Sequence, residues 1–304
     1  MFLLPVLKMQ AQVGPLIQDN WQTNPPYNSV FPIDPSTGTH YKVACDETAI
    51  SRVLHYWQWP KIGRGADFYR RGDILFDAVM EGTVYNCSNM PNDLPLDAPL
   101  ADSKDASLLI FHALVASRHP INGGNINDAT NALVYNFQMK NTLRIVNRND
   151  YTREGWIALT KNELDHGRPI IVGGITTDSP LPDGNVKGHF YLCDGYNLAG
   201  QFHVRWGWGY GYDGYYDIDN FGDYPKDNNF IIGIEPDSTT INTDMEAYFL
   251  ADKASGSYPL TVQFTNKSVN TGATPQYHWD FGDGTTSSIE SPTHTYQSVN
   301  SYTV

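Results

Sequence analysis

The first half of the chain has the hydrophobic spacing of amphipathic helices. In segment 43–60 the apolar residues recur three or four positions apart, as expected for one buried helix face: Ala49, Val53, Leu54 and Trp57. Pro60 is expected to end this helix. The same spacing predicts three further helices, over residues 105–117, 125–137 and 152–166.

Strand patterns follow the helices. Residues 169–175 form a continuous apolar run, which indicates a buried strand. Segments 188–196 and 201–206 flank a short turn and predict a hairpin, and shorter strands are expected at 215–219 and 230–234. Helices first and antiparallel strands later indicate an α+β domain. Segment 61–105, with its prolines, is expected to be mostly loop.

The pattern changes after the last of these strands. Residues 236–246 are polar and rich in Thr, Asn and Asp, which predicts a linker. Beyond it, segments 258–266, 276–281 and 296–304 are expected to be strands of a small all-β module whose last strand is cut short. The expected division is therefore a leader remnant at 1–12, an α+β domain at 13–235, the linker, and an all-β domain at 247–304.

Composition excludes several classes of partner. The 304 residues carry a net charge of −13 and a pI near 4.9, which argues against nucleic acid and against anionic lipid. No apolar stretch approaches the ~20 residues of a membrane-spanning helix, so membrane insertion is not expected. The short apolar start, ending in Ala11-Gln12, predicts a remnant of a signal peptide or of a longer precursor.

Cysteine usage points to one functional thiol. The three cysteines cannot form a closed disulfide set and lack metal-type spacing, so neither a metal nor another cofactor is predicted. Cys45 lies at the start of the first helix, where free backbone N–H groups and the helix dipole favour a thiolate. A nucleophile is commonly mounted in this way. A small buried apolar residue explains the same position, because free cysteines usually serve packing.

His189 is the candidate base. It follows Gly188, which lets another element approach closely, and shares a strand face with Cys193. If the first helix packs across this strand, Cys45 and His189 can form a thiolate–imidazolium pair, and His189 can pass the proton to a leaving amine. Taken alone, His189 is better explained as a core histidine with satisfied hydrogen bonds.

Several motifs occur in a fixed order: Val13-Gly-Pro-Leu-Ile, Trp21, Pro26-Tyr-Asn28, Cys45 with Thr48-Ala49 and Tyr56-Trp57, Gly188-His189, Asp194-Gly195-Tyr196, Trp206-Gly-Trp208-Gly209 and Asp213-Gly-Tyr-Tyr216. Together, over residues 13–235, they resemble the streptopain family of papain-like cysteine peptidases. The resemblance implies a helical part packed on an antiparallel sheet. It also implies Cys45 as nucleophile, His189 as general base, protein or peptide substrates, and a secreted or cell-surface location in a bacterium.

The resemblance also assigns supporting residues, and several of them depart from the family pattern. The family has Trp-x-Gln, whose Gln side chain helps to bind the oxyanion. Here Thr23 holds that place and Gln22 comes one residue early. The family has Asn before Trp206-Gly-Trp208, where it orients the histidine. Arg205 stands there instead, and a guanidinium cannot accept the imidazole N–H.

A third departure lies next to the nucleophile, where Asp46 and Glu47 replace small apolar residues and should raise the thiol's pKa. Losing one oxyanion donor costs ~10²–10³ in rate, so an endopeptidase of attenuated activity is expected. The alternative is a catalytically inactive papain-like surface or binding protein. A transglutaminase-like arrangement of Cys45, His189 and Asp194 is a third possibility, which the ordered motifs disfavour.

The final segment carries the motif Trp279-Asp-Phe-Gly-Asp-Gly284, followed by Thr293-His-Thr-Tyr296 and Tyr302-Thr-Val304. It resembles a PKD domain, which is an immunoglobulin-like β-sandwich. The resemblance implies a spacer or adhesion module that contacts extracellular protein or glycan. Some related modules bind calcium through such acidic turns, but turn capping is the simpler interpretation of Asp280 and Asp283.

Overall fold

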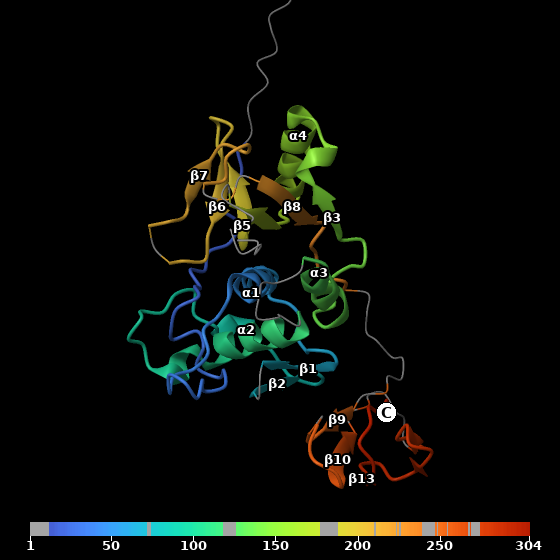
Figure 1. The fold of residues 1–304 in the computed structure, drawn as a ribbon. Helices are drawn as coiled ribbons and strands as arrows, with labels where there is room; N and C mark the ends of the chain where they lie inside the picture. Colours follow the sequence, from blue (N-terminus) through green and yellow to red (C-terminus); the bar gives the residue numbers. More distant parts are fainter. Residues whose placement is uncertain are drawn as a thin grey trace, which may run out of the picture. The chain divides into compact units, whose positions relative to one another are not determined.

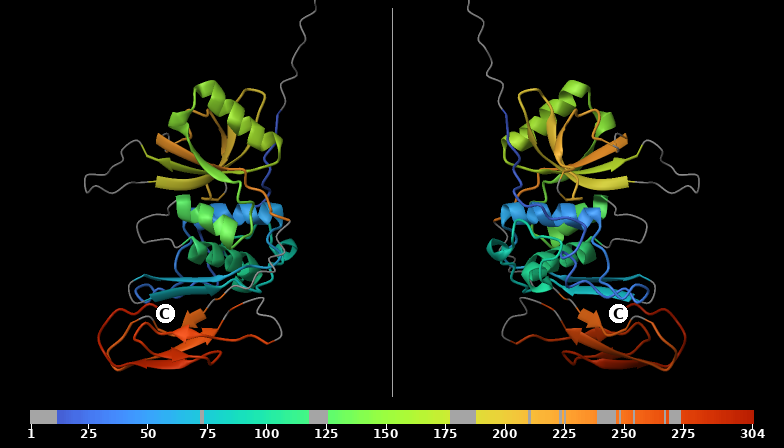
Figure 2. Two further views of the ribbon diagram at one scale, coloured as in Figure 1. Left: turned by 90° about the vertical axis from the view of Figure 1, so that its right-hand side faces the viewer. Right: turned by 90° about the vertical axis from the view of Figure 1, so that its left-hand side faces the viewer.

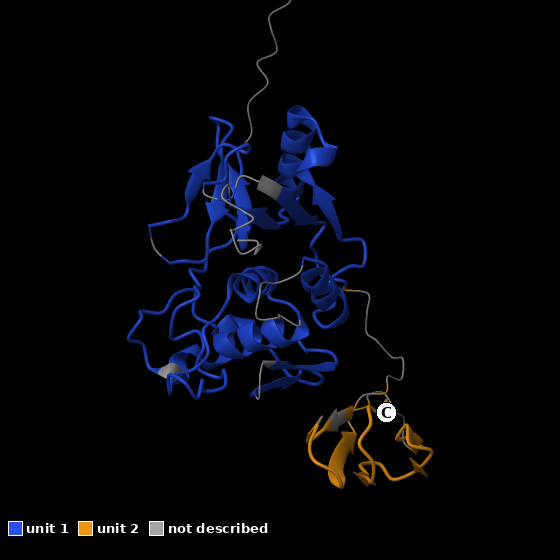
Figure 3. Cartoon of the chain, in the orientation of Figure 1, with its two compact units in different colours: residues 1–237 blue, residues 238–304 orange. Residues whose placement is uncertain are grey.

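The computed structural model divides into two compact units, residues 1–237 and 238–304 (Figure 3). Each unit is described by itself. The structure describes residues 12–71, 74–117, 126–176, 188–209, 211–222, 224, 226–238, 247, 249–253, 255–266, 268 and 274–304. The proposed leader (except Gln12) and most of the proposed linker lie outside these residues.

The described part of unit 1 contains four α-helices, and all four match the predicted segments to within three residues at either end. They are α1 (Cys45–Trp57), α2 (Lys104–Ala116), α3 (Ile126–Tyr135) and α4 (Arg153–Asp165) (Figure 1). Helix α1 ends before Pro60, with Gln58 in the left-handed conformation (φ 51°) as its C-cap. Short 3₁₀ turns occur at η1 (Cys87–Asn89), η2 (Leu100–Ser103) and η3 (Arg148–Asp150).

A six-stranded antiparallel sheet forms the other half of unit 1, in the order β3-β8-β4-β5-β6-β7. Its strands are β3 (Arg144–Asn147), β4 (Ile170–Ile175), β5 (Gly188–Tyr196), β6 (Phe202–Arg205), β7 (Gly214–Tyr216) and β8 (Lys226–Ile232). The predicted hairpin is present as β5–β6, with a bulge between Cys193 and Gly195. Strand β3 was not predicted, β7 is shorter than expected, and β8 begins earlier.

The sheet separates two hydrophobic cores, and Figure 2 shows α4 and the pair α1 and α3 on opposite sides of it. On one side Ile171 and Leu192 pack in the core that includes α1, α2 and α3. On the other side Trp156 of α4 packs with Val172 and Phe230, at 4.1 Å between the Trp156 and Phe230 rings. This alternation along β4 and β5 is the alternation expected of a strand covered on both faces.

The expectation of mostly loop for 61–105 was wrong in part. Strands β1 (Ala66–Arg71) and β2 (Ile74–Val79) form an antiparallel hairpin in this segment. Phe76 of β2 is buried and lies near Phe111 of α2, with 6.5 Å between ring centroids. The pattern was missed because only one face of the hairpin is buried and its strands mix charged and aromatic residues.

Unit 2 is all-β. Strands β9 (Phe249–Ala251), β10 (Leu260–Asn266) and β13 (Thr293–Tyr296) form a sheet in the order β13-β10-β9, and β11 (Trp279–Asp280) pairs with β12 (Thr286–Ser287). The core consists of Val262, Phe264, Trp279, Phe281 and Tyr296. A strand over 296–304 was expected, but pairing with β10 stops at Tyr296 and the polar residues that follow are not in a strand.

The acidic turn of unit 2 uses its carboxylates for local hydrogen bonds. Asp280 Oδ1 accepts from the Gly282 N–H at 2.9 Å, and Asp283 Oδ1 accepts from the Thr285 N–H at 3.1 Å. Asp283 Oδ2 lies 2.8 Å from His294 Nε2. These contacts are those of turn capping. Among the residues that the structure describes, no group of His, Cys, Asp and Glu could hold a metal ion, and no helix is long and apolar enough to cross a membrane.

Candidate active site

Cys45 is the first residue of α1 and is partly buried where this helix meets β5. Its Sγ accepts a hydrogen bond from the Phe190 backbone N–H at 3.4 Å. Phe190 directly follows His189, so the sulfur lies against the strand that carries the candidate base. The segment around Cys45 is fixed by Glu47, whose Oε1 accepts from the Ala44 N–H at 2.5 Å. Helix α1 therefore packs against β5, as the proposed pairing of Cys45 with His189 requires.

The environment of Cys45 favours the neutral thiol. Burial raises the pKa of Cys45 to about 12, with the Asp46 charge adding to the shift and the Phe190 N–H opposing it. The expected effect of the acidic neighbours is therefore confirmed in direction. The expected stabilisation of a thiolate at the helix start is outweighed, because desolvation penalises the charged form.

Asp46 and Glu47 form a buried carboxyl pair beside the nucleophile. Both residues are at most 1% exposed. Burial, followed by the Asp46 charge and a hydrogen bond to Asp46, raises the pKa of Glu47 well above its ordinary value. This shift favours the protonated form of the Glu47 carboxyl. This arrangement follows from two carboxyl groups competing for ionisation in a desolvated site.

His189 is buried at the start of β5, and a backbone carbonyl orients its ring. Its Nε2 lies 2.8 Å from the Trp206 carbonyl oxygen. Because a carbonyl only accepts hydrogen bonds, this contact assigns the ring proton to Nε2 and leaves Nδ1 as the basic nitrogen. The surrounding rings are Trp208, stacked at 4.8 Å, then Tyr224, Tyr191 and Trp206 at 5.1, 5.9 and 6.1 Å.

Burial lowers the pKa of His189 to about 4, although the Trp206 carbonyl and the Asp46 charge each act to raise it. His189 and Cys45 are therefore imidazole and thiol at neutral pH. In the part of the chain that the structure describes they form no direct hydrogen bond, and the Cys45 sulfur accepts from the Phe190 N–H instead. Catalytic hydrogen bonds are often long before substrate binds, so this geometry is compatible with a resting peptidase.

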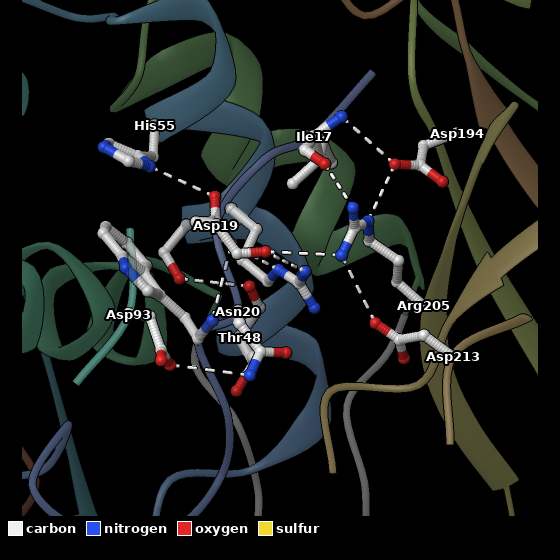
Figure 4. Close-up of polar contacts among 12 residues, drawn as sticks. Ile17, Asp19, Asn20, Thr48, His55, Asp93, Asp194, Arg205 and Asp213 are labelled. Carbon is white, nitrogen blue, oxygen red and sulfur yellow. Dashed lines mark hydrogen bonds and ion pairs between the residues drawn. The ribbon is translucent and has the colours of Figure 1, made fainter. Parts of the chain in front are cut away.

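In the family motif the residue at position 205 orients the histidine. Among the described residues, the Arg205 side chain makes no hydrogen bond to His189. Figure 4 shows its guanidinium directed toward Ile17, Asp194 and Asp213. Its Nε donates to Asp194 at 2.8 Å and its Nη1 to Asp213 at 3.3 Å. The orienting contact to His189 comes instead from the backbone carbonyl of Trp206.

The candidate oxyanion residues lie against the Trp206–Gly209 loop. Gln22 is 6% exposed, and its side chain packs on Gly209, where a Cβ would collide with it. Its Oε1 accepts from Asn24 Nδ2 at 3.2 Å. Thr23 is held through its backbone N–H, which donates to the Gly207 carbonyl at 3.1 Å. Gln22 therefore places its side-chain amide on the loop that orients His189.

Two aspartates near the site have roles that the sequence reasoning missed. Asp213 Oδ1 accepts from the Trp206 N–H at 2.9 Å and so holds the residue whose carbonyl orients His189. Asp194 is fully buried and is engaged by Arg205, by His203 Nδ1 at 2.6 Å and by the Ile17 N–H at 3.1 Å. It makes no contact with His189 among the described residues, which removes the basis for a transglutaminase-like triad. The motifs Asp194-Gly195-Tyr196 and Asp213-Gly-Tyr-Tyr216 were the signals that the sequence offered for them.

Comparisons with known proteins agree with this arrangement. Residues 21–216 match the peptidase C10 family and residues 247–304 match a PKD domain. The thiol protease/hemagglutinin PrtT of Porphyromonas gingivalis is 26% identical over 262 residues, which is 77% of this chain and 29% of that protein. Streptopain of Streptococcus pyogenes is 23% identical over 215 residues, 64% of this chain and 52% of that protein.

The chain thus spans about a third of one of these relatives and half of the other. Among solved structures, the active wild-type interpain A cysteine protease of Prevotella intermedia superposes with a TM-score of 0.63 at 27% identity, covering 72% of this chain and 94% of that one. The papain-like arrangement of unit 1 and the all-β unit 2 are therefore shared with known proteins. This chain belongs to the peptidase C10 family, the streptopain family, and carries a PKD domain after its peptidase domain.

Proposed function

We propose that the chain is a cysteine endopeptidase in which Cys45 is the nucleophile and His189 the general base. The observation that carries the proposal is the contact of Cys45 Sγ with the Phe190 N–H at 3.4 Å, next to His189, in a chain of the peptidase C10 family. The substrates are proteins or peptides, and the site needs no metal or other cofactor for this reaction.

The reaction follows from the protonation states of the two residues. Substrate binding brings a peptide carbonyl to Sγ, and the thiol proton passes to His189 Nδ1 as sulfur attacks the carbonyl carbon. The oxyanion is stabilised by backbone N–H groups at the start of α1 and by the Gln22 amide. The imidazolium then protonates the leaving amine, the C–N bond breaks, and water hydrolyses the thioester with His189 as base.

The resting thiol and imidazole set a limit on the rate. The pKa of Cys45, about 12, lies far above that of His189, about 4, so the ion pair is disfavoured before substrate arrives. The Trp206 carbonyl and Asp46 both favour the protonated imidazole once it forms. We therefore propose attenuated activity, with proton transfer coupled to the binding of substrate rather than completed in advance.

We further propose that the protein acts outside the cell, where the PKD domain serves as a spacer or an adhesion module. A PKD domain follows the peptidase domain in this chain, and one relative is named a thiol protease and hemagglutinin. The acidic net charge of −13 favours solubility and disfavours binding to anionic surfaces.

Labelling with iodoacetamide near neutral pH, together with cleavage of an unfolded protein substrate, tests the assignment. Cys87 and Cys193 are at most 2% exposed and serve as internal reference thiols. We expect Cys45 to be labelled faster than both, and His189→Ala to remove this difference. Cys45→Ala should lower cleavage by more than about 10³-fold, as loss of a nucleophile does in comparable peptidases. Equal labelling of Cys45 and Cys87, with no cleavage, would rule out the proposal.

A further inference from the structure

Arg205 is the centre of a hydrogen-bonded cluster that joins three separate segments of unit 1. We call it the Arg205 cluster: the Arg205 side chain, the carboxylates of Asp194 and Asp213, and the backbone carbonyls of Ile17 and Asp19 (Figure 4). All three guanidinium nitrogens donate to it. Nε binds Asp194, Nη1 binds Asp213 and the Asp19 carbonyl, and Nη2 binds the Ile17 carbonyl.

One branch of the cluster reaches His189. The Asp213 carboxylate binds Arg205 through Oδ2 and the Trp206 N–H through Oδ1, at 3.3 and 2.9 Å. The carbonyl of the same residue, Trp206, lies 2.8 Å from His189 Nε2. Arg205 therefore holds Asp213, Asp213 holds the amide of Trp206, and the carbonyl of Trp206 sets the ring of His189.

The other branch reaches the segment that carries Gln22. Arg205 binds the carbonyls of Ile17 and Asp19, five and three residues before Gln22. Arg52 of α1 donates to the same Asp19 carbonyl at 2.8 Å. The Asp19 carbonyl oxygen therefore accepts from two guanidinium groups, that of Arg52 on α1 and that of Arg205 on β6.

We propose that Arg205 is a positioning residue of the peptidase reaction. Through the Arg205 cluster it holds Trp206, whose carbonyl orients His189, and the segment before Gln22 in place relative to α1. The proposal rests on the proposed peptidase function. Arg205 contacts neither the nucleophile nor the base. Its effect is exerted through Asp213 and Trp206 on one side and through residues 17–19 on the other.

The chemistry of the side chain explains why arginine is required. A planar guanidinium offers five N–H donors in a fixed fork, so it can serve four acceptors that lie in different directions. A lysine ammonium at the same position has one nitrogen and cannot span both carboxylates and both carbonyls. An asparagine is too short to reach them. Arg205→Asn, which restores the family residue, is therefore expected to lower activity rather than raise it.

The test compares four variants of the full chain. Arg205→Lys keeps the charge and loses the fork. Asp213→Ala removes the acceptor of the Trp206 N–H, whereas Asp213→Asn keeps an oxygen at that position. Arg153→Asn is the matched control, because Arg153 also pairs with two aspartates, Asp217 and Asp219, but on the surface. Cleavage and Cys45 labelling are measured at temperatures below each variant's melting transition.

We expect Arg205→Lys and Asp213→Ala to lower kcat by ~10–100-fold, the range expected when reacting groups are displaced by about an ångström. KM should change little, because neither residue contacts substrate. Asp213→Asn should retain most of the activity, and Arg153→Asn all of it. The acidic limb of kcat/KM should move to lower pH in Asp213→Ala, because the general base acts only when neutral and the Trp206 carbonyl raises the pKa of His189. Asp46, the other group that raises this pKa, is unchanged in the variant.

The two proposals fail in different ways. If the unmodified protein neither cleaves protein nor labels Cys45 selectively, the proposed function is wrong. If the unmodified protein is active and Asp213→Ala matches Asp213→Asn in kcat and in pH profile, the positioning role is wrong. The same conclusion follows if Arg153→Asn loses as much activity as Arg205→Lys. Asp213→Ala and Asp213→Asn both keep Arg205 in place. Their comparison therefore remains informative if the Arg205 variants fold poorly.

Discussion

At the scale of single residues, Asp46 acts on both members of the proposed catalytic pair with opposite consequences. Its charge raises the pKa of Cys45, which disfavours the thiolate, and raises the pKa of His189, which favours the imidazolium. Asp46 is the second cause of the Cys45 shift, after burial, and the third cause for His189. The effect on the thiol is therefore expected to dominate.

Replacing Asp46 by Asn should accordingly activate the thiol. The pKa of Cys45 falls, and iodoacetamide labelling at pH 7 should become ~3–10-fold faster, since one pKa unit changes the thiolate fraction tenfold. Asp77→Asn, which removes the same charge from the exposed face of β2, is the control and should leave labelling unchanged. Slower labelling of Asp46→Asn would mean that support of the imidazolium outweighs the effect on the thiol.

The sequence predicted Cys45 and His189 as the catalytic pair but did not predict the group that orients His189. A side chain at a motif position can be recognised by its type, and the family motif placed an orienting residue at position 205. The structure uses the carbonyl of Trp206, and any residue at that position has a carbonyl. The sequence therefore could not show that a backbone carbonyl orients His189 although position 205 is an arginine. It also could not show that the Arg205 side chain binds Asp194.

At the scale of elements, all the long periodic helices were predicted, whereas several short strands were missed. Each predicted helix is present, because ten or more residues of 3.6-residue spacing leave a clear signal. Strands β3, β9 and β12 have two to four residues each and were missed, as was the β1–β2 hairpin. Such strands owe their conformation to their partners, for example β3 to β8, rather than to their own pattern.

Helix α1 is tied to the N-terminal segment by buried charges. Asp19 is 2% exposed. Its Oδ1 accepts a hydrogen bond from Arg52 Nε at 2.6 Å, and its Oδ2 lies 3.1 Å from His55 Nδ1. His55 also stacks on Trp21 at 4.5 Å. Arg52 and His55 are three positions apart on α1, so one helix face makes all these contacts. This anchoring fixes the helix that carries Cys45 relative to the segment that carries Gln22.

Breaking the Asp19–Arg52 pair should destabilise unit 1. We expect Asp19→Asn to lower its free energy of unfolding by about 3–5 kcal/mol, because Arg52 would remain as a buried, uncompensated charge. Urea denaturation followed by tryptophan fluorescence measures the change. Asp219→Asn is the control, since the Asp219 carboxylate pairs with Arg148 and Arg153 but is 39% exposed. Its loss should lower the free energy of unfolding by at most about 1 kcal/mol. Equal losses would contradict the argument.

The same pair predicts a pH dependence. Burial alone would raise the pKa of Asp19, but the charge of Arg52 and the contacts of His55 lower it below the ordinary value of 3.8. A depressed carboxyl pKa stabilises the fold above the unfolded-state value and loses that contribution as pH falls. The stability difference between the unmodified protein and Asp19→Asn should therefore be full at neutral pH and shrink below pH 3.8.

At the scale of the whole molecule, each unit has its own hydrophobic core. Unit 1 has one core on each side of its six-stranded sheet, whereas unit 2 depends on a single cluster around Phe264, Trp279 and Phe281. A domain of this size buries little apolar surface and is only marginally stable. The division of the chain after residue 237 therefore suggests that unit 2 can unfold without disturbing the proposed catalytic pair.

Trp279→Ala tests this independence in the full chain. Trp279 is 8% exposed, its ring lies 5.7 Å from that of Phe264, and its Nε1 donates to the Ile289 carbonyl at 2.8 Å. Truncation of a buried tryptophan costs about 3–5 kcal/mol, enough to unfold unit 2. Calorimetry should show its transition lost while Cys45 labelling stays within about twofold of the unmodified protein. Ile289→Ala, at a side chain that is 64% exposed, should change neither quantity. A parallel fall in Cys45 labelling would show that the PKD domain supports the peptidase site.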